Sequence, residues 1–247
     1  MSTLSLVSVN VERSKHLDLV LPFLESEVPD VVCVQELSER DIPAFSEICG
    51  HGVFAPTQRR VDEEGQPCTG VAIFSRHPLK RTEVRQYVDS GYAMPESGRD
   101  AHTSSDPTNN AVVIAEIQTD VLFRIATTHF TWSPRGGVTE EQRRGMQALI
   151  EILSLYDEII LTGDFNAPRG GEIFSALASR YKDNIPLEYA TSIDVTLHRA
   201  GKDRPEELAD KMVDGLFTTP SYAASDVRLI SGVSDHCAIV ARIAKSK

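Results

Sequence analysis

Several features are missing from this chain of 247 residues, and each absence excludes a class of protein. No apolar run approaches the roughly 20 residues that a helix needs to cross a bilayer, so no membrane association is expected. The N-terminus lacks a basic segment followed by an apolar stretch and a small-residue cleavage site, which predicts a protein that is not secreted. No linker, internal repeat or low-complexity segment interrupts the chain. Its length therefore predicts a single α/β domain over residues 1–247.

Paired cysteines and zinc-type motifs are also missing. The four cysteines show no Cys-x-x-Cys spacing, and Cys33 and Cys237 lie inside apolar segments, where a small buried side chain is usual. None of the seven histidines has zinc-type spacing to another. We therefore expect four reduced structural thiols in a cytoplasmic protein.

Basic runs are short, because no run of lysine and arginine is longer than Arg59-Arg60 or Arg143-Arg144. The formal net charge is −11. Proteins that bind long stretches of nucleic-acid backbone usually present a basic surface, since neutralised phosphates supply most of their affinity. The acidic balance therefore counts against strong non-specific binding to a duplex.

Apolar periodicity predicts strands that alternate with helices. A helix follows Ser14, which we expect to cap it, and the best helix begins at Thr139, where Gln142 completes a capping box. A long polar loop is expected over residues 89–110. The further helices are expected at 41–48 and 173–179, and the strands at 4–11, 30–35, 53–56, 71–74, 111–117, 122–128, 158–162, 212–217, 227–230 and 237–243.

Polar side chains stand at or just past the ends of several apolar strands. The clearest example is Gly-Asp-Phe-Asn at 163–166, which follows the apolar strand 158–162 and places Asp164 and Asn166 in a turn. The others are Asn10, Glu36, His129, and the pair Asp235 and His236. Core packing does not explain this recurrence, whereas the edge of a sheet is where α/β enzymes bind ligands.

Each of these residues also has a simpler interpretation. Glu36 is either exposed at the end of its strand or a ligand of a cation. His129 alone is more often a satisfied, partly buried side chain, and Asp214 alone fits a turn before Gly215. Taken together, the carboxylate and amide oxygens suffice for a hard cation, for which Mg²⁺ or Mn²⁺ suits better than Zn²⁺.

The motifs, in this order, resemble the endonuclease/exonuclease/phosphatase superfamily with its deoxyribonuclease I-like fold. They run from the first strand to the last: Ser8-Val9-Asn10-Val11, Val34-Gln35-Glu36, Gly70 to Arg76, Thr128-His129-Phe130, Gly163-Asp164-Phe165-Asn166, Met212 to Phe217 and Ser234-Asp235-His236. The resemblance implies a four-layer α/β sandwich of two mixed β-sheets flanked by helices.

The resemblance also implies roles for these residues. Glu36 is the central metal ligand, with Asn10 and Asp235 beside it. His236 activates the attacking water, and Asp214 orients that histidine. The remaining three would act at the phosphate: His129 contacts it or assists the leaving group, Asp164 orients the water, and Asn166 donates to a non-bridging oxygen.

These roles predict a phosphoesterase, dependent on Mg²⁺ or Mn²⁺, in which water attacks a phosphodiester in line. The expected substrate is nucleic acid at ends or single strands, whether DNA or RNA, and the sequence identifies no protein partner. His129 replaces the tyrosine of abasic-site endonucleases, so abasic-site repair is disfavoured. Trp132 either stacks on a base or packs on an apolar wall.

Two alternatives stay open: a phosphatase or phospholipase-like hydrolase of inositol phosphates or sphingomyelin, and a catalytically silent binding module. The silent module is disfavoured, because an inactive relative should have lost one of the motif residues, and all of them are present.

Overall fold

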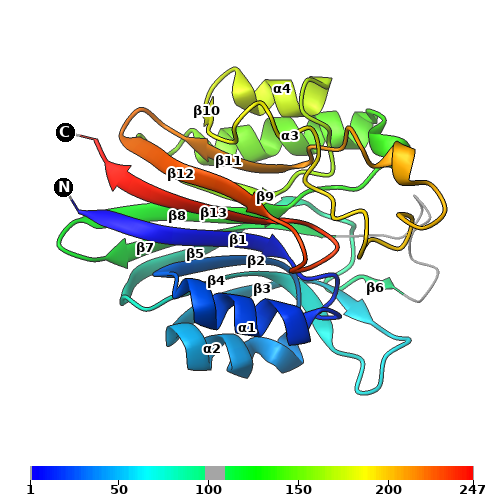
Figure 1. Cartoon of the computed structure of the whole chain (residues 1–247), viewed down its shortest axis with the longest axis horizontal. Coiled ribbons are helices and arrows are strands. Elements are labelled where there is room, and N and C mark those ends of the chain that lie inside the picture. Colours follow the sequence, from blue (N-terminus) through cyan, green and yellow to red (C-terminus); the bar gives the residue numbers. More distant parts are fainter. Residues whose placement is uncertain (1, 98–108, 247) are drawn as a thin grey trace.

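Two mixed β-sheets pack face to face in the computed structural model, which describes residues 2–97 and 109–246 (Figure 1). The first sheet contains β1 (Thr3–Asn10), β2 (Val31–Ser38), β3 (His51–Arg60), β4 (Cys68–Ser75), β6 (Glu96–Ser97), β12 (Tyr222–Ile230) and β13 (Ala238–Lys245), in the order β12-β13-β1-β2-β4-β3-β6. The second contains β5 (Leu79–Val88), β7 (Asn110–Gln118), β8 (Leu122–His129), β9 (Ile160–Asp164), β10 (Lys182–Asp183) and β11 (Asp214–Thr218), in the order β10-β11-β9-β8-β7-β5.

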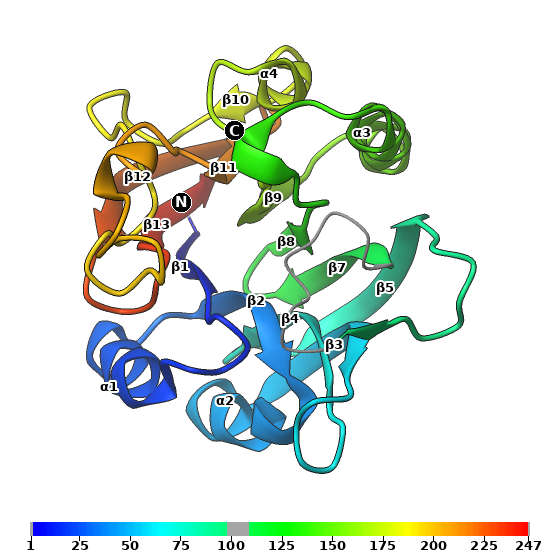
Figure 2. The same ribbon diagram turned by 90° about the vertical axis from the view of Figure 1, so that its right-hand side faces the viewer.

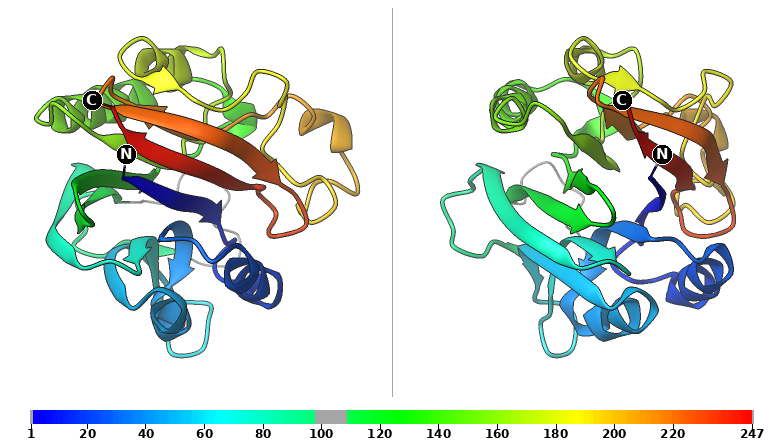
Figure 3. Two further views of the ribbon diagram at one scale, coloured as in Figure 1. Left: turned by 60° about the vertical axis from the view of Figure 1, so that its left-hand side comes forward. Right: turned by 90° about the vertical axis from the view of Figure 1, so that its left-hand side faces the viewer.

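Helices cover the outer face of each sheet (Figure 2). The first sheet is covered by α1 (Leu17–Glu27) and α2 (Ile42–Cys49), and the second by α3 (Glu140–Leu153) and α4 (Glu172–Ala178). Strands β1 and β13, from opposite ends of the chain, lie side by side as antiparallel neighbours (Figure 3). The predicted four-layer sandwich of two mixed sheets is therefore confirmed.

The central strands are apolar on both faces because each face packs against a different core. In β1, Leu4 and Leu6 lie in the core between the sheets, whereas Val7 and Val9 lie in the core under α1 and α2. This division follows from the two-residue period of a strand, which sends successive side chains to opposite faces. A strand buried on both faces has a nearly continuous apolar sequence.

Along the inner face, the side chains change from apolar to polar toward one end of the sandwich. In β1 the inner positions continue from Leu6 to Ser8 and Asn10, both buried. The inner face of β8 changes in the same way, from Phe123 and Ile125 to Thr127 and His129, and that of β9 from Ile160 to Thr162 and Asp164. The sandwich therefore has an apolar middle and a polar end.

A buried glutamine links the two sheets where this change begins. Gln35 on β2 is fully buried, and its amide donates to Ser8 Oγ at 3.2 Å and to Thr127 Oγ1 at 2.8 Å. Thr127 belongs to β8 in the opposite sheet. The polar end is thus held in register by side-chain hydrogen bonds between the sheets.

Of the two predicted helix caps, the one at Ser14 is wrong and the one at Thr139 is confirmed without the reciprocal half of its capping box. Ser14 does not cap α1, which begins after His16; the Ser14 hydroxyl instead accepts a hydrogen bond from the backbone of Ser38. Thr139 does cap α3, and its side chain accepts from Gln142 N. The reciprocal half of the capping box is absent, because the Gln142 side chain donates to Thr131 O at 2.8 Å.

Three strands were not predicted: β5, β6 and the two-residue β10. Strand β5 lies at the edge of its sheet and exposes much of its length, so its sequence is polar and charged and lacks a strand-like apolar run. Strand β6 has two residues and lies inside the predicted 89–110 loop, of which residues 98–108 are outside the described part of the chain. All four cysteines are buried and free. In residues 2–97 and 109–246, no helix has both the length and the apolar character needed to cross a membrane.

Candidate active site

The carboxyl ends of the central strands bring the predicted residues together. Strands β1 and β2 are parallel neighbours in one sheet, and β8 and β9 are parallel neighbours in the other, where His129 pairs with Asp164. Strand β11 runs antiparallel to β9, so its first residue, Asp214, also pairs with Asp164. Parallel and antiparallel partners thus deliver polar side chains to the same end of the sandwich.

Glu36 enters the site through an irregularity of β2. The register between β2 and β4 shifts between Val34 and Leu37, and Glu36 has a left-handed backbone with φ of 57°. A bulge of this kind re-aims a side chain that would otherwise follow the alternation of the strand. The Glu36 side chain is 25% exposed and, among the described residues, has no lysine or arginine partner.

Asn10 connects two carboxylates from opposite sheets. Its amide nitrogen lies 3.2 Å from Glu36 Oε1 and 3.1 Å from Asp164 Oδ2, and donates to both. Its amide oxygen accepts from the backbone nitrogen of Glu12 at 3.0 Å. Asn10 therefore holds Glu36 and Asp164 at a fixed separation.

The second turn residue, Asn166, positions His129. Its amide nitrogen donates to Phe130 O at 2.8 Å and lies 2.9 Å from His129 Nε2, which therefore acts as an acceptor. The backbone nitrogen of Asn166 donates to Asp164 Oδ1 at 2.8 Å, closing the turn. His129 Nε2 lies 3.6 Å from Asp164 Oδ2 and 3.7 Å from Glu36 Oε1.

Gly163 allows β9 to approach β8 closely at this turn. Its φ is 149°, and a Cβ at this position would lie 2.1 Å from Thr128 O. No other residue fits without moving the backbone of β8. The glycine of the Gly-Asp-Phe-Asn motif thus sets the distance between the strands that carry Asp164 and His129.

His236 is held by a buried aspartate. Its Nδ1 donates to Asp214 Oδ2 at 2.8 Å, which directs Nε2 toward the site, 3.8 Å from Asp164 Oδ2. Burial alone would lower the pKa of His236, but the carboxylates of Asp214 and Asp164 outweigh burial and hold the pKa well above its usual value.

Ser192 completes this arrangement. Its hydroxyl donates to Asp214 Oδ2 at 2.6 Å and accepts from the backbone nitrogens of Val213 and Asp214, each at 3.1 Å. Ser192 has no motif around it that would reveal a role from the sequence. The structure makes it the second hydrogen-bond donor to the carboxylate that orients His236.

Asp235 points away from this dyad, although it is the next residue in the chain. It hydrogen-bonds neither Asn10 nor Glu36, and its neighbours are Glu12 and His16. Burial raises the pKa of Asp235 to about 6 despite His236, and the carboxylates of Glu12 and Glu36 add to the rise. Neither Glu12 nor His16 was singled out from the sequence.

This chain belongs to the endonuclease/exonuclease/phosphatase family, whose model matches residues 7–236. None of the curated proteins matches it in sequence. Among solved structures, the chain is similar to an endonuclease/exonuclease/phosphatase from Bacteroides vulgatus, with a TM-score of 0.72, 15% identity and 100% of each chain covered.

Two further solved structures resemble the chain over nearly its whole length. The mannosyl-6-phosphatase Bt3783 of Bacteroides thetaiotaomicron has a TM-score of 0.68 and 13% identity, with 98% of this chain and 99% of that chain covered. The D. rerio TDP2 complexed with single strand DNA product has a TM-score of 0.67 and 16% identity, with 99% and 100% covered. The family is one of hydrolases that act on phosphoester bonds, and these neighbours share the fold.

Proposed function

We propose that the protein is a divalent-metal-dependent phosphoesterase that hydrolyses a phosphodiester by in-line attack of water. The observation that supports this is that a candidate cation ligand, Glu36, and an oriented histidine, His236, both lie close to Asp164. Asn10 links Asp164 Oδ2 to Glu36 at one side, and His236 Nε2 lies 3.8 Å from the same oxygen at the other. A phosphate bound between Glu36 and His236 would contact the cation held by Glu36 and the oriented histidine together.

Glu36 would hold the cation. Its carboxylate is partly exposed and has no basic partner among the described residues, and the carboxylate of Asp164 shares the Asn10 amide with it, so carboxylate oxygens are the available donors. Such donors suit Mg²⁺ or Mn²⁺. When bound, the cation would polarise the phosphoryl group and offset the carboxylates that hold the proton on His236.

The side chains of this protein supply the remaining chemistry. Asp214 and Ser192 keep His236 in the orientation in which Nε2 takes the proton of the attacking water. Asp164 aligns that water through its Oδ2. With phosphate bound, the Asn166 amide would exchange its 2.9 Å hydrogen bond to His129 Nε2 for one to a phosphate oxygen, and the freed His129 nitrogen would donate to the phosphate once protonated.

For the substrate, we propose a nucleic-acid end or a single strand. The net charge of −11 disfavours a long duplex track, because few phosphates would be neutralised. Trp132 follows His129 by three residues and is 43% exposed, as a side chain that stacks on an unpaired base needs to be. The TDP2 structure that resembles this chain holds a single-stranded DNA product.

Hydrolysis of a phosphomonoester is the second candidate. It is favoured by the similarity to the mannosyl-6-phosphatase, which covers 98% of this chain. The two candidates share the catalytic groups and differ in what lies beyond the phosphate: a base that stacks on Trp132, or a small polyol without an aromatic partner.

An activity panel tests the proposal. Purified protein would be assayed with Mg²⁺ or Mn²⁺ on single-stranded DNA, duplex DNA, RNA, tyrosyl-linked DNA, inositol phosphates and sugar phosphates. We expect the highest kcat/KM on single-stranded ends, and loss of turnover in excess chelator. Glu36→Gln should lose at least about 100-fold, since polarisation by a metal is worth several kcal/mol.

Glu47→Gln is the matched control, because Glu47 is an exposed carboxylate on α2. It should keep wild-type activity. Full turnover in chelator, or equal activity of the two variants, would overturn the metal-dependent mechanism. A preference for sugar phosphates over all nucleic acids would select the second candidate.

A further inference from the structure

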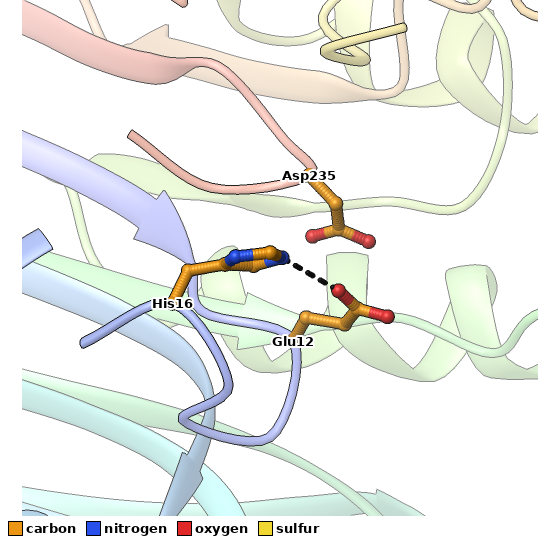
Figure 4. Close-up of side chains that lie close together, drawn as sticks. All are labelled: Glu12, His16 and Asp235. Carbon is orange, nitrogen blue, oxygen red and sulfur yellow. Dashed lines mark hydrogen bonds and ion pairs between the residues drawn. The ribbon is translucent and has the colours of Figure 1, made fainter. Parts of the chain in front are cut away.

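A second group of potential ligands lies just past the end of β1. It consists of Glu12, His16 and Asp235, whose ligand atoms all lie within 4.8 Å of one another (Figure 4). Donor atoms around one metal ion, at bond lengths of about 2.0 to 2.3 Å, stand about 3 to 4.5 Å apart. The spacing of this group is therefore close to that of a coordination shell.

The two carboxylates are well buried, with relative exposures of 8% for Glu12 and 6% for Asp235, and the His16 side chain is 12% exposed. The only hydrogen bond of the Asp235 carboxylate in the described structure comes from Ser234 Oγ, at 3.3 Å, to Oδ1. Figure 4 shows this carboxylate directed toward the space between His16 and Glu12. A buried carboxylate with so few donors, facing another, is costly unless a positive charge lies between them.

Lys15 neutralises only part of this charge. Its Nζ lies 3.0 Å from both oxygens of Glu12, but the side chain is 55% exposed and does not reach Asp235. Exposed ion pairs contribute about 0–1 kcal/mol, so Lys15 is easily displaced by a stronger cation. The His16 ring lies with Nε2 2.8 Å from Glu12 Oε2, a hydrogen bond that a bound ion would replace by moving the two atoms slightly apart.

We propose that Glu12, His16 and Asp235 form a site for a divalent first-row transition-metal ion, distinct from the Glu36 site. One imidazole and two carboxylates suit ions from Mn²⁺ to Zn²⁺, whereas Mg²⁺ prefers oxygen ligands alone. This inference goes beyond the proposed function, which needs only a hard cation at Glu36. It also assigns Asp235 to a different ion from the one that the family resemblance implied.

The two sites are connected through the backbone. Asn10, which contacts Glu36, accepts a hydrogen bond from the backbone nitrogen of Glu12, and Asp235 precedes His236. An ion at the second site would therefore stand directly behind the residues that contact the phosphate. It would steady the segment after β1 and the segment before β13 by joining them.

Binding stoichiometry tests the inference without an activity assay. Metal-free protein would be titrated with Mn²⁺ under electron paramagnetic resonance, and with Zn²⁺ by calorimetry. We expect two Mn²⁺ ions per chain in the wild type, of which excess Mg²⁺ displaces only the one at Glu36. Loss of a group that merely supports a ligand weakens a site about 10- to 100-fold, so His16→Gln and Glu12→Gln should weaken the second site at least 100-fold.

Glu36→Gln should remove the first ion and keep the second, and His51→Gln, at an exposed histidine on β3, should keep both. Circular dichroism would verify the fold of each variant. One ion per chain in the wild type, or unchanged Mn²⁺ and Zn²⁺ affinity in both His16→Gln and Glu12→Gln, would overturn the inference. Those results would leave the proposed function standing, because the latter depends on Glu36.

Discussion

Replacing Asp214 by asparagine tests the orientation of the proposed base. Asp214 Oδ2 accepts from His236 Nδ1 at 2.8 Å and from Ser192 Oγ at 2.6 Å. An asparagine has the same size but can turn its NH₂ group toward Nδ1, which would place the ring proton on Nε2. Nε2 of His236 would then already carry a proton and could not take one from the attacking water. The same exchange in a serine-protease triad costs about 10⁴ in kcat, so we expect a loss of about 10³- to 10⁴-fold.

The assay is steady-state hydrolysis of a p-nitrophenyl phosphodiester at saturating Mg²⁺, combined with a histidine NMR titration. Asp214→Asn should also lower the pKa of His236, because the strongest of the three carboxylates that raise it loses its charge. Ser192→Ala should have a smaller effect of roughly 10- to 100-fold, since a hydrogen bond to a charged group is worth about 1.5–3 kcal/mol. If the Asp214→Asn protein is folded and its kcat lies within tenfold of the wild type, the proposed orientation of His236 by Asp214 is refuted.

Three further results are expected. Trp132→Ala should raise KM for single-stranded DNA by about 5- to 100-fold, because base stacking is worth about 1–3 kcal/mol; an equal loss on a small phosphodiester would argue against stacking. Burial lowers the pKa of His198 to about 4, with His236 and Arg199 adding to the effect, so stability is lost as the pH falls from about 6.5 toward that value. Between pH 7 and pH 4.5, the free energy of unfolding of His198→Gln should therefore fall by roughly 1–2 kcal/mol less than that of the wild type, after a discount for partial exposure. Urea titrations at the two pH values would measure this, and an equal fall in both proteins would contradict it. Gly163→Ala should cost at least about 3 kcal/mol in the same titration, because its Cβ would lie 2.1 Å from Thr128 O; wild-type stability would mean that β8 and β9 separate easily.

Central strands could be predicted from the sequence because each is buried on two faces and is therefore apolar along its length. The edge strand β5 could not, since its exposed face mixes lysine, arginine, glutamate and glutamine in a pattern that resembles a loop. Helix caps were predicted less well. Thr139 does cap α3, but Ser14 is used elsewhere because the chain makes an irregular turn before α1.

Much of the candidate site could be predicted for a related reason: a polar residue that ends an apolar strand is conspicuous in the sequence. Ser192 could not be paired with Asp214, because it comes from an irregular segment with no periodicity. Glu12 and His16 could not be linked to Asp235 either. The turn that brings them together has left-handed backbones at Glu12, Arg13 and Ser14, with φ of 43°, 59° and 62°. None of these residues is a glycine, so the sequence does not predict a left-handed turn there.

The site takes its residues from both sheets, and this determines the order in which activity and secondary structure are lost on denaturation. Asn10 and Glu36 move with one sheet, whereas His129 and Asp164 move with the other, and the contacts of Gln35 and Asn10 span the gap. Turnover therefore depends on the position of one sheet relative to the other. A slip of one ångström between them would break the hydrogen bonds across the gap while leaving every strand intact. On gentle denaturation, catalysis should vanish while the circular dichroism of the strands is still unchanged.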